Sequence, residues 1–209
     1  ITTNTNATAV GFNALTANTA ANNTAVGATA LDSNTSGTGN TAVGFAALTT
    51  NTTANNSTAV GDLALNLSTG ASNTAVGSSA LANVSTGIQN TALGHSAGTT
   101  ISTASNVTAI GYNALGANTA AENTAVGSTA LDSNNSGTGN TALGFAALTA
   151  NTTTNNSTAV GHNALVASTG GDNTALGKDA GNAITTGSGN LILGRGITGN
   201  TGDTNRIYL

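Results

Sequence analysis

The chain lacks several residue types on which compact globular domains depend. Its 209 residues include no proline, cysteine, methionine or tryptophan, and aromatic residues make up only 2%. The absence of cysteine excludes disulfide bonds and thiolate chemistry. Bulky side chains normally fill a compact core, whereas alanine, valine and leucine supply most of the apolar residues here. Any core must therefore be thin, which favours an elongated fold.

Charged residues are also scarce, at 5% of the chain, and the formal net charge is −4. Only Lys178, Arg195 and Arg206 are cationic, whereas binding to phosphates requires clustered lysine or arginine. No apolar run approaches the roughly 18 residues that a membrane helix needs. The composition therefore argues against nucleic acid binding and against membrane insertion.

A four-residue phrase, Thr-Ala-Val-Gly with Leu or Ile sometimes replacing Val, recurs every 16 or 17 residues. A fixed period of this kind is the signature of a repeat architecture. Low-complexity disorder is the alternative that the Asn, Thr, Gly and Ser content raises, but disorder does not require Val, Leu or Ile before every motif glycine. The twelve motif glycines are Gly11, Gly27, Gly44, Gly61, Gly77, Gly94, Gly111, Gly127, Gly144, Gly161, Gly177 and Gly194.

The repeat favours β-structure over helix, because it is rich in Thr and Val and is interrupted by Gly- and Asn-containing turns. The sequence predicts an all-β fold, a parallel β-solenoid (β-roll) of about twelve coils of 16–17 residues. Successive coils should stack about 4.8 Å apart. We expect a single domain over residues 1–209, a segment of a longer chain, with atypical terminal coils over 178–209 that form a cap or junction. A period of 50 residues groups the coils in threes, and a stronger period of 100 lies above it.

Leucine follows the motif glycine by four positions in nine coils. Where Gly98 or Gly181 takes this place, an isoleucine, Ile101 or Ile184, appears three residues later. Such an exchange predicts that both positions face one shared interior. Asparagines at the later position then lie inside or at a corner, either as a hydrogen-bonded ladder or as turn formers. They are Asn18, Asn34, Asn51, Asn118, Asn134 and Asn151.

The motif glycine is expected at a corner that needs positive φ or a close backbone approach. Alternation along the strand places Thr and Val on one face and Ala on the other, and the pattern leaves open which face is interior. If Ala points inward, Thr and Val form a flat outward strip, either covered by other chains or exposed to a repetitive target. The threonines of this candidate flat face are Thr8, Thr24, Thr41, Thr58, Thr74, Thr91, Thr108, Thr124, Thr141, Thr158 and Thr174.

The position just after the motif glycine is variable and holds every aromatic residue except Tyr208. Exposed aromatic side chains serve as contact anchors, so this column is a candidate contact ridge. The alternative is that its side chains cover the corner glycine of a neighbouring coil. The candidate residues are Phe12, Phe45, His95, Tyr112, Phe145 and His162.

Catalytic groups do not converge in this sequence. Its seven acidic residues are scattered, the serines and threonines have no recurrent base partner, and His95 and His162 lie four coils apart. We therefore expect no enzymatic activity, no cofactor, and no catalytic or metal site.

The phrase Asn-Thr-Ala-Val-Gly-x-x-Ala-Leu, at residues 23–31 and 40–48, resembles the repeat regions of phage tail fibres and bacterial surface fibres. It is also similar to the coil motif of trimeric autotransporter adhesin heads, and the final residues 205–209 resemble the end of such arrays. The resemblance implies a parallel β-roll, commonly trimeric, with an adhesive or spacer role. It predicts an extracellular homo-oligomer or end-to-end fibre, on a cell surface or virion or secreted, with a receptor or glycan as a possible ligand.

Ice binding is the second hypothesis. A nearly uncharged solenoid with threonine columns resembles antifreeze β-solenoids, which hold ordered water on a threonine-bearing face. The candidate flat face would then bind ice. A second threonine column could serve instead, and it comprises Thr19, Thr35, Thr52, Thr69, Thr119, Thr152 and Thr169.

Overall fold

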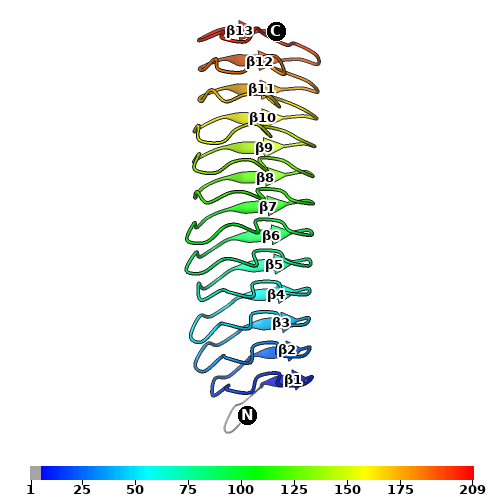
Figure 1. Ribbon diagram of the computed structural model, residues 1–209, viewed down its shortest axis with the longest axis vertical. Helices are drawn as coiled ribbons and strands as arrows, with labels where there is room; N and C mark the ends of the chain where they lie inside the picture. Colours follow the sequence, from blue (N-terminus) through cyan, green and yellow to red (C-terminus); the bar gives the residue numbers. More distant parts are fainter. Residues whose placement is uncertain (1–5) are drawn as a thin grey trace. The chain divides into compact units, whose positions relative to one another are not determined.

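The computed structural model describes residues 6–209, in which the repeated phrase forms short parallel strands. Each strand but the last spans three residues, and turns join them without any helix in the described part of the chain. The predicted all-β parallel solenoid is thereby confirmed (Figure 1). The strands are β1 (Thr8–Val10), β2 (Thr24–Val26), β3 (Thr41–Val43), β4 (Thr58–Val60), β5 (Thr74–Val76), β6 (Thr91–Leu93), β7 (Thr108–Ile110), β8 (Thr124–Val126), β9 (Thr141–Leu143), β10 (Thr158–Val160), β11 (Thr174–Leu176), β12 (Leu191–Leu193) and β13 (Ile207–Tyr208).

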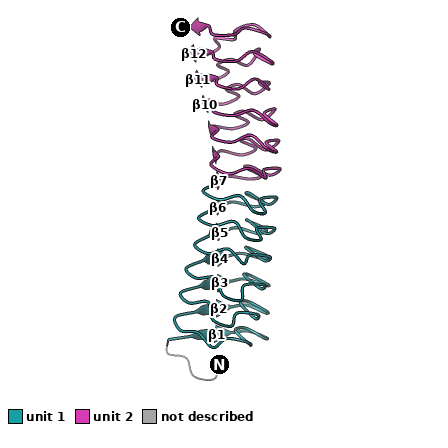
Figure 2. Ribbon diagram, turned by 90° about the vertical axis from the view of Figure 1, so that its left-hand side faces the viewer, with its two compact units in different colours: residues 1–106 teal, residues 107–209 magenta. Residues whose placement is uncertain are grey.

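The chain forms two compact units, Ile1–Asn106 and Val107–Leu209, which Figure 2 shows in teal and magenta. The first unit contains β1 to β6 and the second contains β7 to β13. Within each unit every strand pairs in parallel with the next strand of the sequence, so that equivalent residues lie side by side. The repeat of the sequence is therefore also the repeat of the hydrogen-bonded ladder.

Backbone hydrogen bonds between coils continue beyond the strands. The amide of Thr29 donates to the carbonyl of Phe12 at 2.8 Å, and that of Leu31 donates to Ala47 at 3.1 Å. The turns at the corners are thus hydrogen-bonded to the adjacent coils, as the strands are. This satisfies the polar groups of a backbone that is otherwise poor in regular structure.

The alanine of each strand from β2 to β11 is buried in the interior of its unit. Ala25, Ala42 and Ala59 are fully buried, while the Thr and Val on either side remain partly exposed. This settles the orientation that the alternating pattern left open. Alanine is the inward residue because the leucine column approaches from across the coil: a Cβ added at Gly181, in the leucine column, would lie 3.5 Å from Cδ1 of Ile192, in the alanine column.

The leucines of the repeat are held in an unusual backbone conformation. Their φ angles lie between 49° and 55°, in the left-handed region, which costs about 1 kcal/mol or more per non-glycine residue. Burial of a leucine side chain contributes roughly 1.5–3 kcal/mol, and these leucines are at most 1% exposed. Burial therefore offsets the strained turn.

Glycine replaces this leucine twice and keeps the same left-handed conformation, with φ of 61° at Gly98 and 66° at Gly181. Ile101 and Ile184 are fully buried, which confirms that the exchanged positions share one interior. In the second unit Ile192 also helps to fill the space, because it replaces the usual strand alanine and is fully buried.

The motif glycines have φ angles between 129° and 143°. From Gly11 to Gly77, and again from Gly111 to Gly177, an added Cβ would lie 2.3–2.6 Å from the carbonyl oxygen of the next motif glycine. Real Cβ atoms do not approach this closely. Both expectations for this position, a positive φ and a close backbone approach, are confirmed.

A hydrogen-bonded asparagine ladder, one of the two alternatives that the sequence left open, is present inside both units. Asn34 donates from Nδ2 to Oδ1 of Asn18 at 2.7 Å, and Asn51 donates to Asn34 at 3.1 Å. In the second unit Asn134 donates to Asn118 at 2.7 Å. All five amides are at most 2% exposed. The ladder, rather than a turn preference alone, accounts for the column.

A second asparagine ladder precedes the strands and was not predicted from the sequence. Oδ1 of Asn40 accepts a hydrogen bond from the amide of Ser57 at 2.9 Å, and its Nδ2 donates to the carbonyl of Ala54 at 2.8 Å. Asn23 binds the coil of Asn40 in the same way. The sequence did contain a signal for this ladder, because an asparagine precedes Thr-Ala-Val-Gly in the phrase that resembles fibre repeats. The sequence alone did not indicate a structural role for that asparagine. Each of these side chains joins two backbone groups of the next coil.

Candidate functional site

The outward side of the strands forms a regular surface, which we call the Thr/Val face. It consists of the first and third residues of β1 to β11, and these lie on either side of the buried alanine. All eleven threonines of the candidate flat face lie on it, partly or fully exposed. Because the strands pair in register, equivalent side chains lie one coil apart, at about 4.8 Å.

The third strand residue makes the Thr/Val face strongly apolar. Val10 is 58% exposed, Leu93 48%, Leu143 45% and Leu176 53%. Isolated apolar side chains on a protein surface need no explanation, but a contiguous row marks an interaction surface. The face therefore presents one apolar row and one hydroxyl row within each unit.

The two threonine columns differ in what their hydroxyls do. Thr19 donates from Oγ1 to the carbonyl of Thr35 at 2.7 Å, and Thr35 donates to Thr52 at 2.9 Å. Thr119 and Thr169 bond to the next coil in the same way. Five of the seven threonines of the second column thus use their hydroxyls to bind the backbone of the next coil.

On the Thr/Val face, in contrast, the hydroxyls from Thr24 to Thr174 make no hydrogen bond to any other residue among 6–209. They remain available to water or to another molecule. Of the two columns that the sequence offered for ice binding, only the first has free hydroxyls throughout from Thr24 to Thr174, whereas in the second only Thr52 and Thr152 do.

The candidate contact ridge lies at the corner that follows the Thr/Val face. Phe12 is 75% exposed, Phe45 57%, Tyr112 60% and Phe145 52%, and both histidines are exposed as well. Side chains that covered the corner glycines would be less accessible than this. The ridge is therefore an exposed row beside the Thr/Val face.

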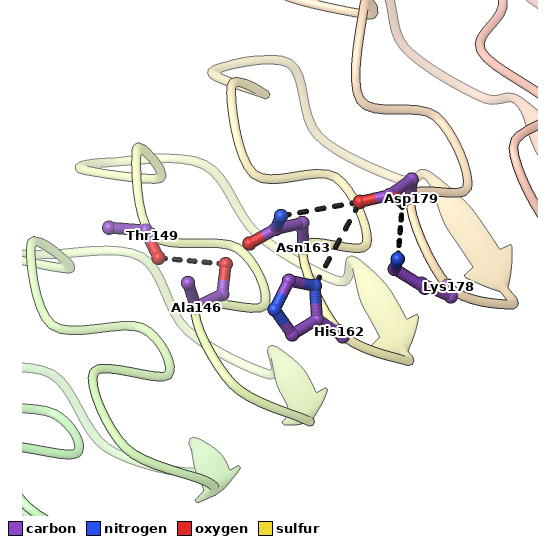
Figure 3. Close-up of polar contacts among 6 residues, drawn as sticks. All are labelled: Ala146, Thr149, His162, Asn163, Lys178 and Asp179. Carbon is purple, nitrogen blue, oxygen red and sulfur yellow. Dashed lines mark hydrogen bonds and ion pairs between the residues drawn. The ribbon is translucent and has the colours of Figure 1, made fainter.

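Polar and aromatic ridge groups come together in the second unit, and Figure 3 shows His162 among its polar neighbours Asn163, Lys178 and Asp179. The rings of Phe145 and His162 stack with centroids 5.2 Å apart and an angle of 19° between their planes. Asp179 lies 3.9 Å from Nδ1 of His162 and 3.6 Å from Nζ of Lys178, and its Oδ1 accepts a hydrogen bond from Nδ2 of Asn163 at 3.2 Å. One carboxylate thereby holds side chains of two consecutive coils.

The last coil has a contact of its own. The hydroxyl of Tyr208 donates a hydrogen bond to Oδ2 of Asp203, which also accepts from the amide of Asn200 at 2.8 Å. The Tyr208 hydrogen bond lowers the pKa of the Asp203 carboxyl below its ordinary value, and the same bond raises the pKa of Tyr208. Tyr208 pairs in the ladder with Ile192, so it continues the column that alanine occupies elsewhere.

Residues 6–209 contain no cluster of His, Asp or Glu that could hold a metal ion, and no cavity is found among them. No helix in this part of the chain is long and apolar enough to cross a bilayer. Comparison of the chain with protein family models, curated proteins and solved structures found no match.

Proposed function

We propose that the chain is a non-enzymatic segment of an extracellular fibre, which carries a regular surface for attachment. The observation that supports this best is the apolar row of the Thr/Val face, repeated in register on the strands of each unit. A row of apolar side chains that are half-buried to exposed is unfavourable in water. We propose that further copies of the chain cover it, as in a trimer, and that no cofactor or metal takes part.

The dimensions of the Thr/Val face bear on how such copies associate. A strand of three residues is about 10 Å long and six coils stack over about 29 Å, so the face of one unit covers roughly 300 Å². A stable interface buries about 800 Å² per partner. The face of a single unit is smaller than this, so the association that we propose must also bury side chains outside the face. Its strength should therefore grow with the number of coils.

Charged substitutions on the apolar row test the proposal. Light scattering on the full chain should give the mass of an oligomer, and Leu93→Glu with Leu143→Glu should reduce it to the monomer mass. These residues are 48% and 45% exposed, so the fold should tolerate the change. Leu67→Glu is the matched control, because Leu67 is 47% exposed but lies outside the face. A wild-type chain that stays monomeric at high concentration would contradict the proposal.

Ice binding is a second candidate function, and the free hydroxyls of the Thr/Val face favour it. If ice is the partner, the monomer should shape ice crystals and show thermal hysteresis. Thr41→Tyr with Thr58→Tyr should abolish this activity, because the large rings interrupt the face. Thr52→Tyr should keep it, since Thr52 belongs to the second column. A chain without thermal hysteresis would rule out this candidate.

A further inference from the structure

The ridge of the second unit has a composition found nowhere else in the chain. Phe145, His162, Lys178 and Arg195 follow one another on four successive coils, each directly after a motif glycine. The internal repeat of 100 residues supplies a natural comparison in the first unit. There the same four positions hold Phe45, Asp62, Ser78 and His95. The row of the second unit is therefore aromatic and cationic, whereas the equivalent row of the first unit contains an acid and a serine.

The side chains of this row are held in place before any ligand binds. Stacking on Phe145 orients the ring of His162, and the carboxylate of Asp179 lies within 4 Å of both His162 and Lys178. Asn163 fixes that carboxylate with a hydrogen bond, as Figure 3 shows. Groups that are already ordered lose less entropy on binding.

Charge distinguishes the row from the rest of the molecule. Asp179 forms an ion pair with Lys178, and with His162 when the imidazole is protonated; these are the ion pairs among residues 6–209, and Arg195 is exposed and forms none. The row thus carries two cations, Lys178 beside Asp179 and the unpaired Arg195, in a chain whose net charge is −4. An unpaired guanidinium can form paired hydrogen bonds with a carboxylate.

We propose that this row, Phe145 to Arg195 with Asn163 and Asp179, binds an acidic glycan, a linear polysaccharide that contains uronate residues. The inference rests on the attachment role proposed above and names its ligand. The exposed aromatic stack offers an apolar surface to the C–H groups of a pyranose ring. The Asn163 amide and Asp179 carboxylate can exchange hydrogen bonds with sugar hydroxyls, and Lys178 and Arg195 bind the sugar carboxylates.

The presence of Asp179 is the reason to choose a glycan over an acidic peptide. The acidic side chains of such a peptide carry only carboxylates, which this acid would repel, whereas each uronate ring carries hydroxyl groups beside its carboxylate that can donate hydrogen bonds to Asp179. The four ridge side chains also lie along one line, at about 4.8 Å per coil, which suits a linear chain of sugar rings.

Affinity electrophoresis of the full chain tests this site, in native gels that contain polygalacturonate, dextran or polyglutamate. Wild-type protein should be retarded by polygalacturonate and not by the other two polymers. Phe145→Ala should weaken binding about fivefold through loss of the stacked ring. Arg195→Ala should weaken it about threefold, since a single exposed ion pair is worth little.

Matched variants separate the site from general charge attraction. Phe45→Ala removes the equivalent ring of the first unit, and Arg206→Ala removes a cation outside the ridge, so both should bind like wild type. Equal retardation by polyglutamate or dextran, or an equal loss in Arg206→Ala, would overturn the proposal. If the chain is oligomeric but is not retarded by polygalacturonate, the proposed ligand is wrong, and the proposed fibre role is not affected. If the chain is monomeric and is retarded by polygalacturonate, the proposed ligand is supported and the proposed oligomer is contradicted.

Discussion

Replacement of the motif glycine Gly144 by alanine should destabilise the second unit severely, although it adds a single methyl group. The φ angle of Gly144 is 143°, where side chains of L-residues are strained. The added Cβ would lie 2.4 Å from the carbonyl oxygen and 2.6 Å from the carbonyl carbon of Gly161. Both contacts are with backbone of the next coil, which cannot move aside as a flexible side chain would.

Two contributions set the magnitude of this effect. The backbone conformation costs about 1–3 kcal/mol for a residue other than glycine. Forcing the two coils apart should cost about 1–3 kcal/mol more, as overpacking does in other interiors. The sum is roughly 2–6 kcal/mol, against a total of about 5–15 kcal/mol for an ordinary domain. With a urea dependence of about 2 kcal/mol/M, the unfolding midpoint should fall by 1–3 M, all order-of-magnitude values.

Urea unfolding followed by circular dichroism measures this shift, with Gly202→Ala as the control. Gly202 has no atom within 4 Å of an added Cβ and does not have a positive φ, so alanine there should change the midpoint very little. If Gly144→Ala and Gly202→Ala unfold at the same urea concentration, the close approach of the coils does not limit this position. Neither backbone strain nor crowding would then explain why glycine occupies it.

Three further changes test other parts of the fold. Leu65→Ala should cost about 2–5 kcal/mol because it leaves a cavity, whereas Leu67→Ala, two residues away and 47% exposed, should cost less than about 0.5 kcal/mol in the same urea unfolding experiment. Asn40→Ala leaves the buried amide of Ser57 without a partner, while the carbonyl of Ala54 keeps its hydrogen bond from Asn51; the change should cost about 1–3 kcal/mol and should speed hydrogen exchange of the Ser57 amide. Because its folded-state pKa is lowered from 3.8, Asp203 stabilises the second unit above that pH and loses this contribution as the pH falls through the lower, folded-state pKa. The pKa of Tyr208 is raised from 10.0 in the folded state, so Tyr208 stabilises the second unit below pH 10.0, and this contribution is lost as the pH rises through the higher, folded-state pKa. If the melting temperature of Tyr208→Phe depends on acid and alkaline pH as that of the wild type does, both of these expectations are contradicted.

The sequence predicted the coil count, the strand positions and part of the interior, because a repeat exposes each structural role many times. The exchange of Leu for Gly98 with the gain of Ile101 identified two inward positions without any structure. The asparagines that occupy the position of Ile101 in other coils could then be placed inside the coil or at a corner. Their hydrogen bonds to adjacent coils could not be predicted from the sequence and are seen only in the structure.

Which face of the strand is buried could not be predicted, and the physical reason is the width of the coil. Hydrophobicity alone would place Val26 inside in preference to Ala25, yet Ala25 is buried and Val26 is 36% exposed. In a coil of 16 or 17 residues the side chains that enter from opposite walls meet near the middle, so only a small one fits beside the leucine. The cluster around Asp179 was also missed, because its members are ordinary surface residues until the coils stack.

The direction of the hydrogen bonds has a mechanical consequence for a fibre segment. Within each unit the bonds of the ladder join one coil to the next, so they point along the stacking direction and not across it. Tension applied to the two ends of a unit acts on every coil in series, but the terminal coil separates first because it is bonded to a neighbour on one side only. Each coil that peels away releases about 55 Å of extended chain in place of about 4.8 Å of stacked length. Such a segment would extend under tension in small, nearly equal steps of one coil each, while the remaining coils stay folded.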